Sequence, residues 1–318
     1  MDKHILIAGG AGFIGSHLSK MLINLGKKVV SLDNLSTGRK SNIEDLLGSP
    51  NFTFIESDTR DKKSLSSLSN FTFSKIYDLA SPASVTYISD HPIETATVNS
   101  IGVKNLLDLA KECNAAFLFA SSSEVYGDPL EHPQKESYRG NVNPVGVRSG
   151  YDEGKRFGEA LCMAYHREYG VNVKIVRIFN TYGPNSSTVD TRVVPQLVRQ
   201  ALLGEPLTVH GDGKQTRSFC FVSDMVEGII AMMESSETGP INIGNPDEYT
   251  INDLASKIIS MTGSSSKIKY VVRPKDDPKK RKPDITLAKK KLGWEPKVGL
   301  TEGLTKTIAY FRQVLKRK

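Results

Sequence analysis

A tyrosine, a lysine and a serine-rich segment are spaced as the oxidation of an alcohol would require. Tyr151 and Lys155 are four residues apart, on one face of a helix, and Ser121-Ser122-Ser123-Glu124 ends an apolar run upstream. As a phenolate, Tyr151 would remove the hydroxyl proton while a hydride leaves the carbon for an acceptor. A free tyrosine has a pKa near 10, so this role at about pH 7 requires about 4 kcal/mol of phenolate stabilisation. We expect Lys155 and a cationic acceptor to provide it, because opposite charges favour the ionised form. The alternative is an amphipathic helix with Tyr151 in the core and Lys155 in solvent.

A glycine-rich segment predicts that the acceptor is a dinucleotide. Gly9-Gly10-Ala11-Gly12-Phe13-Ile14-Gly15 directly follows an apolar run, and an acid, Asp33, follows the next one. Glycines let the backbone turn sharply and approach a pyrophosphate, whose charge then faces the N-terminus of the next helix. Asp33 could bind the adenosine ribose and would repel a 2′-phosphate, which favours NAD over NADP. Arg39 and Lys40 lie nearby and could offset that repulsion.

The NAD-binding residues expected from this pattern extend over several strand ends. Asp58 is expected to face the adenine, with a helix cap as the alternative. The full expected set is Gly9, Gly12, Phe13, Ile14, Gly15, Asp33, Asn34, Asp58, Leu79, Ala80, Tyr151 and Lys155.

Alternating strands and helices must position these residues. Apolar runs at 4–9, 28–32, 52–56, 75–80, 115–120 and 173–179 predict strands, and helical periodicity covers 17–26, 94–113 and 151–169. This alternation predicts an α/β protein with a Rossmann-type, doubly wound parallel sheet. After residue 180 Gly- and Pro-rich loops predict a smaller C-terminal α/β substrate-binding lobe. We expect an NAD-binding domain at 1–180, completed by about 219–238, and the lobe at 181–318.

Composition excludes several other classes of protein. The net charge is +7, but residues 273–318 hold 15 Lys/Arg and 5 Asp/Glu, which leaves the rest at −3. Since a nucleic-acid-binding protein normally spreads its basic residues over one face, we expect no nucleic-acid partner and interpret this region as a solvated helix with an anion pocket. Cysteine and histidine spacings predict no disulfide and no metal site. No apolar run spans a membrane and no signal peptide is evident, so a cytoplasmic location is expected.

The order of the motifs resembles that of the extended short-chain dehydrogenase/reductase superfamily over essentially the whole chain. Besides the motifs above, the resemblance includes Asn180-Thr181-Tyr182-Gly183-Pro184 and Gln215-Thr216-Arg217-Ser218-Phe219. It implies that the lobe binds a nucleotide-linked sugar, with Asn180, Arg192 and Arg217 holding the diphosphate. The planar fork of arginine suits this role because it binds phosphate oxygens in pairs. The resemblance also implies a homodimer formed through the helices at 94–113 and 151–169.

The residues after the serines distinguish the reactions of this superfamily, which begin with oxidation at C4 of the sugar. Dehydratases have Asp-Glu there, and simple 4-epimerases generally lack a carboxylate at the Glu124 position. Ser123-Glu124 instead resembles the UDP-glucuronate decarboxylase (UDP-xylose synthase) family. The resemblance extends to Ala80-Ser81-Pro82-Ala83-Ser84, to Ser123-Glu124-Val125-Tyr126-Gly127-Asp128-Pro129, to RSGYDEGKR at 148–156 and to DDPKKRKPDI at 276–285.

This resemblance implies a reaction and a set of site residues. Tyr151 and NAD would oxidise C4 of UDP-glucuronate, with Ser122 bound to the same oxygen, and the resulting β-keto acid would lose CO2. Glu124 with Arg281 would control protonation at C5, and reduction of C4 would give UDP-xylose. The implied catalytic residues are Tyr151, Lys155, Ser122, Glu124 and Arg281, and the implied substrate-binding residues are Ser84, Tyr87, Asn180, Arg192, Gln215, Arg217 and Arg281.

One segment departs from the family pattern. These decarboxylases usually continue Ser-Pro-Ala-Ser with Pro-Pro-x-Tyr, whereas this chain has Val85-Thr86-Tyr87-Ile88, which displaces the tyrosine by one position. A 2-acetamido UDP-uronate is therefore an alternative substrate, and a 4-epimerase or 4,6-dehydratase relative is an alternative activity. A non-catalytic NAD-binding regulator is a further alternative, but such proteins typically lose the tyrosine or the lysine, and this chain has both.

Overall fold

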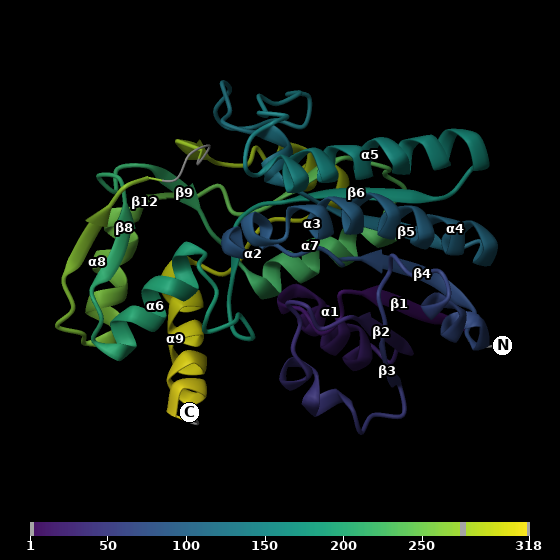
Figure 1. The fold of residues 1–318 in the computed structure, drawn as a ribbon, viewed down its shortest axis with the longest axis horizontal. Coiled ribbons are helices and arrows are strands. Elements are labelled where there is room, and N and C mark those ends of the chain that lie inside the picture. Colours follow the sequence, from purple (N-terminus) through teal and green to yellow (C-terminus); the bar gives the residue numbers. More distant parts are fainter. Residues whose placement is uncertain (1–2, 274–277, 317–318) are drawn as a thin grey trace.

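A seven-stranded parallel sheet lies at the centre of the computed structural model, which describes residues 3–273 and 278–316 (Figure 1). The strands follow the order β11-β6-β5-β4-β1-β2-β3, and each neighbouring pair is parallel. Their bounds are β1 His4–Ala8, β2 Val29–Asp33, β3 Phe52–Glu56, β4 Phe73–Asp78, β5 Ala116–Ser122, β6 Val173–Ile178 and β11 Ile241–Ile243. The predicted Rossmann-type α/β fold is confirmed.

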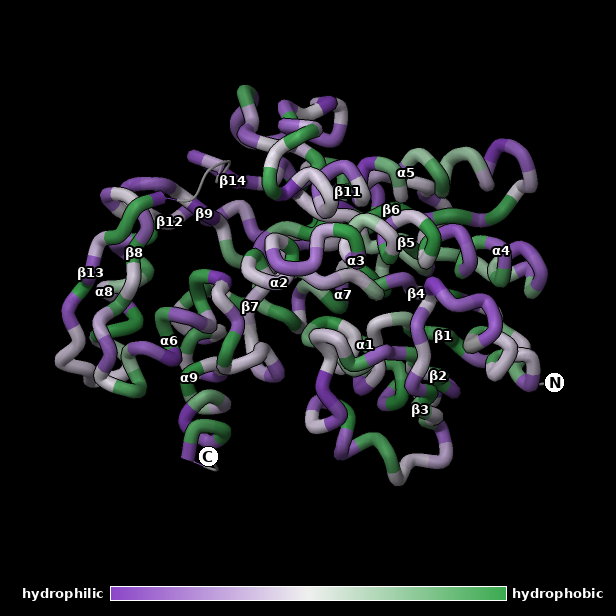
Figure 2. Tube along the Cα trace, in the orientation of Figure 1, coloured by the Kyte–Doolittle hydropathy of each residue, from purple (hydrophilic) through white to green (hydrophobic). Residues whose placement is uncertain are grey.

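Helices cover both faces of this sheet. Helices α1 (Phe13–Asn24) and α7 (Val222–Glu234) pack on one face, while α4 (Val103–Cys113) and α5 (Ser149–Tyr169) pack on the other. Successive residues of a strand point to opposite faces, so Ile5 and Ile7 of β1 join the core under α1, and Leu6 and Ala8 join the core under α4. This is why apolar residues occur on both faces of the central strands. In Figure 2 hydrophobic and hydrophilic residues alternate along α4 and α5, as expected for helices with one buried face.

The strand order reverses between β1 and β4, and this reversal creates the crevice in which such sheets bind ligands. From β1 the chain proceeds outward to β2 and β3, then returns to β4 on the other side of β1. The glycine segment follows β1 directly and leads into α1. Short helices α2 (Val85–Asp90) and α3 (Pro92–Thr97) follow β4, and a π-helical turn at Val98–Gly102 connects α3 to α4.

A smaller lobe lies beside the carboxyl ends of the central strands (Figure 1). It contains the parallel pair β8 and β13 and the three-stranded sheet β12-β9-β14. The bounds of these elements and of the lobe's helices are α6 Val193–Leu203, β8 Leu207–His210, β9 Thr216–Ser218, β12 Glu248–Thr250, α8 Ile251–Thr262, β13 Ile268–Val271, β14 Lys280–Arg281 and α9 Leu300–Lys316. The chain crosses between the two parts several times, and it re-enters the central sheet through α7 and β11.

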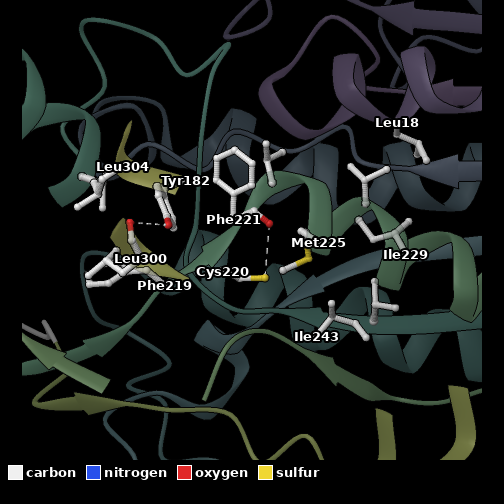
Figure 3. Close-up of a cluster of buried hydrophobic side chains, with 14 of the residues drawn as sticks. Leu18, Tyr182, Phe219, Cys220, Phe221, Met225, Ile229, Ile243, Leu300 and Leu304 are labelled. Atoms are coloured by element: carbon white, nitrogen blue, oxygen red, sulfur yellow. Dashed lines mark hydrogen bonds between the residues drawn. The ribbon is translucent and has the colours of Figure 1, made fainter. Parts of the chain in front are cut away.

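Apolar side chains join the lobe to the central sheet. Strands β7 (Thr181–Tyr182) and β10 (Cys220–Phe221) pair in parallel between the two parts. Tyr182, Phe219 and Leu300 pack on the lobe side of this pair, and Met225 and Ile229 continue the cluster toward the sheet (Figure 3). Cys162 and Cys220 are buried free thiols, and the free thiol of Cys113 is partly buried. Within the described residues, no helix combines the length and apolarity that a membrane span requires.

Candidate active site

One large cavity lies at the carboxyl ends of the central strands and continues into the lobe. Its volume is about 1120 Å³, which is at or above the upper end of ordinary small-molecule sites, about 1,000 Å³. It therefore has room for two ligands of moderate size. The structure brings together at this cavity the predicted residues Gly9, Gly12, Phe13, Ile14, Gly15, Asp33, Asn34, Asp58, Leu79, Ala80, Ser84, Tyr87, Ser122, Glu124, Tyr151, Lys155, Asn180, Arg192, Gln215 and Arg217.

The glycine segment forms a tight turn at one end of the cavity. Gly9 has a φ of +80°, which favours glycine, and a Cβ there would lie 2.5 Å from the carbonyl oxygen of Leu79. A Cβ on Gly15 would lie 2.1 Å from the carbonyl oxygen of Gly9. Only glycine lets the turn and the first residues of α1 pack this closely. The N-terminus of α1 consequently opens into the cavity, where its N–H groups suit a pyrophosphate.

Asp33 is placed to bind a ribose at the end of β2. Its carboxylate is buried and accepts hydrogen bonds from the backbone N–H of Ala11 (3.0 Å) and Leu35 (2.8 Å). Burial raises the pKa of Asp33, and these hydrogen bonds oppose the rise. Arg39 donates to the carbonyl oxygen of Asn185 at 2.8 Å, and Lys40 pairs with Glu56 at 2.8 Å. Because both cations have partners of their own, the site fits a free ribose hydroxyl better than a 2′-phosphate.

Asp58 and Tyr87 belong to a polar network beside Asp33. Hydrogen bonds from Arg60 hold the pKa of Asp58 down at about 2, against the effect of burial, and Asn34 also donates to Asp58 at 3.0 Å. Arg60 pairs with Glu94 at 3.4 Å, and the Tyr87 hydroxyl donates to Glu94 at 2.9 Å. The structure therefore groups Tyr87 with the Asp58 network, and Tyr87 also lines the cavity that contains Tyr151.

Tyr151 and Lys155 lie in the first two turns of α5, facing the end of β5. Both are buried, and Lys155 Nζ donates to the carbonyl oxygen of Ala120 at 2.8 Å. Burial raises the pKa of Tyr151 to about 12, although a hydrogen bond with Ser122 lowers it. The predicted lowering of the pKa of Tyr151 depends on a cationic acceptor as well as on Lys155, so it stays a prediction. Lys155 Nζ lies 5.8 Å from the centroid of the tyrosine ring and donates to a carbonyl, so its charge does not overcome the cost of burial.

Asp78, which the sequence analysis missed, lies behind this pair. It ends β4, beside Phe119 of β5, on the face covered by α5. Burial raises the pKa of Asp78 to about 6 and the charge of Lys155 opposes the rise, while burial lowers the pKa of Lys155 to about 8 and Asp78 opposes that fall. A charged residue at the carboxyl end of an apolar strand was the signal that identified Asp33, and it could have identified Asp78.

Glu124 lies between two arginines that are distant in the sequence. Arg148, immediately before α5, pairs with Glu124 at 2.8 Å, and Arg281 of β14 pairs with the same oxygen at 3.3 Å. Arg281 is 1% exposed and also donates to the carbonyl oxygen of Ser123 at 2.5 Å. It does not line the cavity, whereas Arg148 does. The structure thus brings Arg281 to Glu124 and adds Arg148, which the sequence analysis had not singled out. Asp276 and Asp277, which begin the DDPKKRKPDI segment, lie outside the described residues.

The lobe supplies cationic and amide side chains to the same cavity. Arg192 pairs with Asp190 at 2.6 Å and lies 5.9 Å from the ring centroid of Phe13 in α1. Arg217, on β9, donates to the carbonyl oxygen of Thr216 at 2.9 Å. Gln215 donates to the carbonyl oxygen of His210 at 2.6 Å. Both arginines line the cavity and bring positive charge to its lobe side.

Comparison with known proteins is consistent with this geometry. Residues 6–307 match the family described as GDP-mannose 4,6 dehydratase. UDP-glucuronic acid decarboxylase 3 of Arabidopsis thaliana is 52% identical over 304 residues, which are 95% of this chain and 87% of the relative. The structure of a Thermotoga maritima UDP-glucose 4-epimerase with UDP-glucose has a TM-score of 0.91 at 33% identity and covers 98% and 99% of the two chains. A Bacillus cereus UDP-glucuronic acid 4-epimerase, solved with UDP-glucuronic acid and NAD, has a TM-score of 0.86 at 30% identity over the same shares.

Proposed function

Because this chain belongs to the extended short-chain dehydrogenase/reductase superfamily, and within it to the UDP-glucuronic acid decarboxylases, we propose that it converts UDP-glucuronate to UDP-xylose and CO2. NAD is its cofactor and a UDP-sugar its substrate. The observation that carries the proposal is Glu124, a carboxylate held by two arginines in the cavity that also contains Ser122 and Tyr151.

The chain's own residues have distinct tasks in this reaction. When bound, NAD supplies the reversible two-electron oxidation of the C4 alcohol to a ketone. Tyr151 takes the proton of the C4 hydroxyl, Ser122 hydrogen-bonds the same oxygen, and the charge of Lys155 stabilises the phenolate. The pKa of about 12 for Tyr151 already includes the hydrogen bond with Ser122, so about 7 kcal/mol of further phenolate stabilisation is needed at pH 7, and we assign most of it to the cationic nicotinamide.

Decarboxylation follows from the position of the ketone. The C4 carbonyl is β to the carboxylate, so when the C5–C6 bond breaks its electron pair passes to C5 and on to the C4 oxygen. CO2 leaves, and C5 takes one proton. We assign the control of this protonation to Glu124, with Arg281 acting through Glu124. C4 is then reduced again, so the cycle is redox-neutral and consumes one proton per CO2.

The two parts of the chain have separate binding roles in this proposal. Residues 1–180, completed by about 219–238, serve as the NAD-binding part, and residues 181–318 bind the nucleotide sugar. Arg192, Arg217 and Asn180 hold the diphosphate. The chain acts in the cytoplasm as a homodimer through α4 and α5, and the exposed side chains of Ile101 (48%) and Phe157 (51%) near these helices support that interface.

Product analysis tests the proposal directly. The purified protein, incubated with UDP-glucuronate and NAD, should release CO2 and form UDP-xylose in equal amounts, measured by CO2 trapping and NMR. Formation of UDP-galacturonate without CO2 would instead identify a 4-epimerase. A UDP-2-acetamido uronate in a parallel reaction should turn over much more slowly than UDP-glucuronate.

A further inference from the structure

The proposed reaction adds a proton to C5, and Glu124 on its own is not protonated enough to provide it. Burial on its own raises the pKa of Glu124, but the charges of Arg148, Arg281 and Arg217 outweigh burial and the net shift is downward. At neutral pH Glu124 is therefore a carboxylate without a proton to give. A second group must supply one proton for every CO2 released.

A second, small cavity lies beside Arg148, the ion-pair partner of Glu124. Its volume is about 190 Å³, enough for several water molecules. Arg148 lines both cavities, so the arginine that pairs with Glu124 contacts the main cavity and the small one. The other residues that line the small cavity are Gly127, Asp128, Asn141, Val142, Asn143, Gly146 and Asp152. Asp128, Asn141 and Asn143 are exposed, which puts the small cavity in reach of solvent.

Asp152 is the buried acid of this small cavity. Asp152 is the residue after Tyr151 in α5, and it is 8% exposed. Its Oδ1 atom is fully buried and has no hydrogen-bond partner in the described part of the chain. Buried polar atoms are rarely left unpaired, so an exception calls for an explanation in function or bound water.

Charges from three other segments act on Asp152. Burial, together with the negative charges of Glu124 and Glu153, raises its pKa to about 7, although the charges of Arg148 and Arg281 oppose the rise. The same two arginines thus act on both acids, and they leave Glu124 ionised while Asp152 is partly protonated near neutral pH. The pKa values of the two carboxyl groups are shifted in opposite directions, as expected where one acid accepts a proton from the other.

We propose that Asp152 supplies the proton that C5 takes up, passing it through Glu124 from the water of the small cavity. The inference rests on the proposed decarboxylation. In each turnover Asp152 gives its proton to Glu124, Glu124 passes that proton to C5, and water in the small cavity gives a new proton to Asp152. The relay transfers protons only and changes no oxidation state. One proton from solvent takes the place of the lost CO2 on C5. Asp152 is a positioning and supply residue, since it acts through Glu124 and does not touch the sugar.

Asp152→Asn tests this proposal in the full-length enzyme with NAD and UDP-glucuronate. The amide keeps the shape of the side chain and removes its proton. We expect UDP-xylose formation to slow by about 100-fold, the lower end of general acid–base effects. CO2 should still appear as a burst of one equivalent per site in the first turnover, because C–C cleavage precedes protonation. The solvent deuterium isotope effect on the steady-state rate should rise above that of the unchanged protein.

Two variants control the experiment. Asp128→Asn makes the same replacement in the same cavity, at an exposed residue that accepts a hydrogen bond from Lys279 N–H, and it should leave both the rate and the isotope effect unchanged. Asp152→Glu restores a carboxyl group and should recover at least a tenth of the rate. If Asp152→Asn slows CO2 release and UDP-xylose formation equally, with no burst, Asp152 has only a structural role and the inference is wrong.

The unchanged protein provides a test that does not depend on the folding of any variant. Since Asp152 must be protonated to act, kcat should fall as the pH rises through about 7. A kcat that stays constant from about pH 6 to pH 8 would overturn the relay. Absence of CO2 release by the unchanged protein would instead refute the proposed function itself, so the two failures are distinguishable.

Discussion

Replacing Arg281 with methionine separates two roles that this arginine could have. In one role it contacts the sugar carboxylate, as the sequence resemblance implies. In the other it acts only through Glu124, as its burial and its place outside the cavity indicate. The two roles affect different kinetic constants, because a lost substrate contact weakens binding, whereas a misplaced Glu124 slows a step after binding.

The ion pairs of Glu124 set the loss of stability that we expect in Arg281→Met. Removal of one partner from a buried ion pair costs about 3–5 kcal/mol. Arg148 stays 2.8 Å from Glu124, so the lower end applies and we expect a loss of about 3 kcal/mol in the free energy of unfolding. This corresponds to a melting temperature lower by about 6 °C for a large domain. The double variant Glu124→Gln/Arg281→Met should lose less than the sum of the two single changes, because the Glu124–Arg281 interaction is lost in both single variants and is counted twice in that sum.

Steady-state kinetics with UDP-glucuronate decides between the roles. For Arg281→Met we expect kcat to fall about tenfold, or about 1.4 kcal/mol, with KM changed by less than about twofold. Arg192→Met serves as the contrast, because Arg192 lines the cavity and its loss should mainly raise KM. A KM raised more than tenfold in Arg281→Met, at unchanged kcat, would refute our reasoning and restore the direct contact with the sugar.

Three further changes test the rest of the site. Tyr151→Phe should lower kcat by at least about 100-fold, because it removes the base for the C4 hydroxyl, and should leave UDP affinity, measured by calorimetric titration, within a few-fold. Lys155 must be protonated to stabilise the phenolate, so kcat/KM should fall as pH rises through about 8. In Asp78→Asn this fall should begin at lower pH, because the anion that raises the pKa of Lys155 is gone; an unmoved pH profile would contradict the assignment. Gly15→Ala would place a methyl group 2.1 Å from the Gly9 carbonyl oxygen; it should cost about 1–3 kcal/mol in thermal unfolding and abolish NAD retention during gel filtration.

The strands and the cofactor turn could be predicted because their signals are local. Six apolar runs correspond to β1–β6 within two residues at either end, since strands buried on both faces need no distant partner to be recognised. The glycine turn and Asp33 follow from the residues beside them. β11, with only three residues, and the short strands of the lobe have no comparable signal, because they are stabilised by pairing with distant segments.

The sequence by itself determined which chemical groups the protein has: a tyrosine and lysine on one helix, a serine and a glutamate at a strand end, and a turn that accepts only glycine. Only the tertiary structure decided their electrostatic state. It brings Arg148 and Arg281 to Glu124, confines Lys155 beside a carbonyl, and groups Tyr87 with Glu94. The reason is that the energy of a buried charge depends on its distance to other charges and on its loss of water, and both are set by segments far apart in the chain.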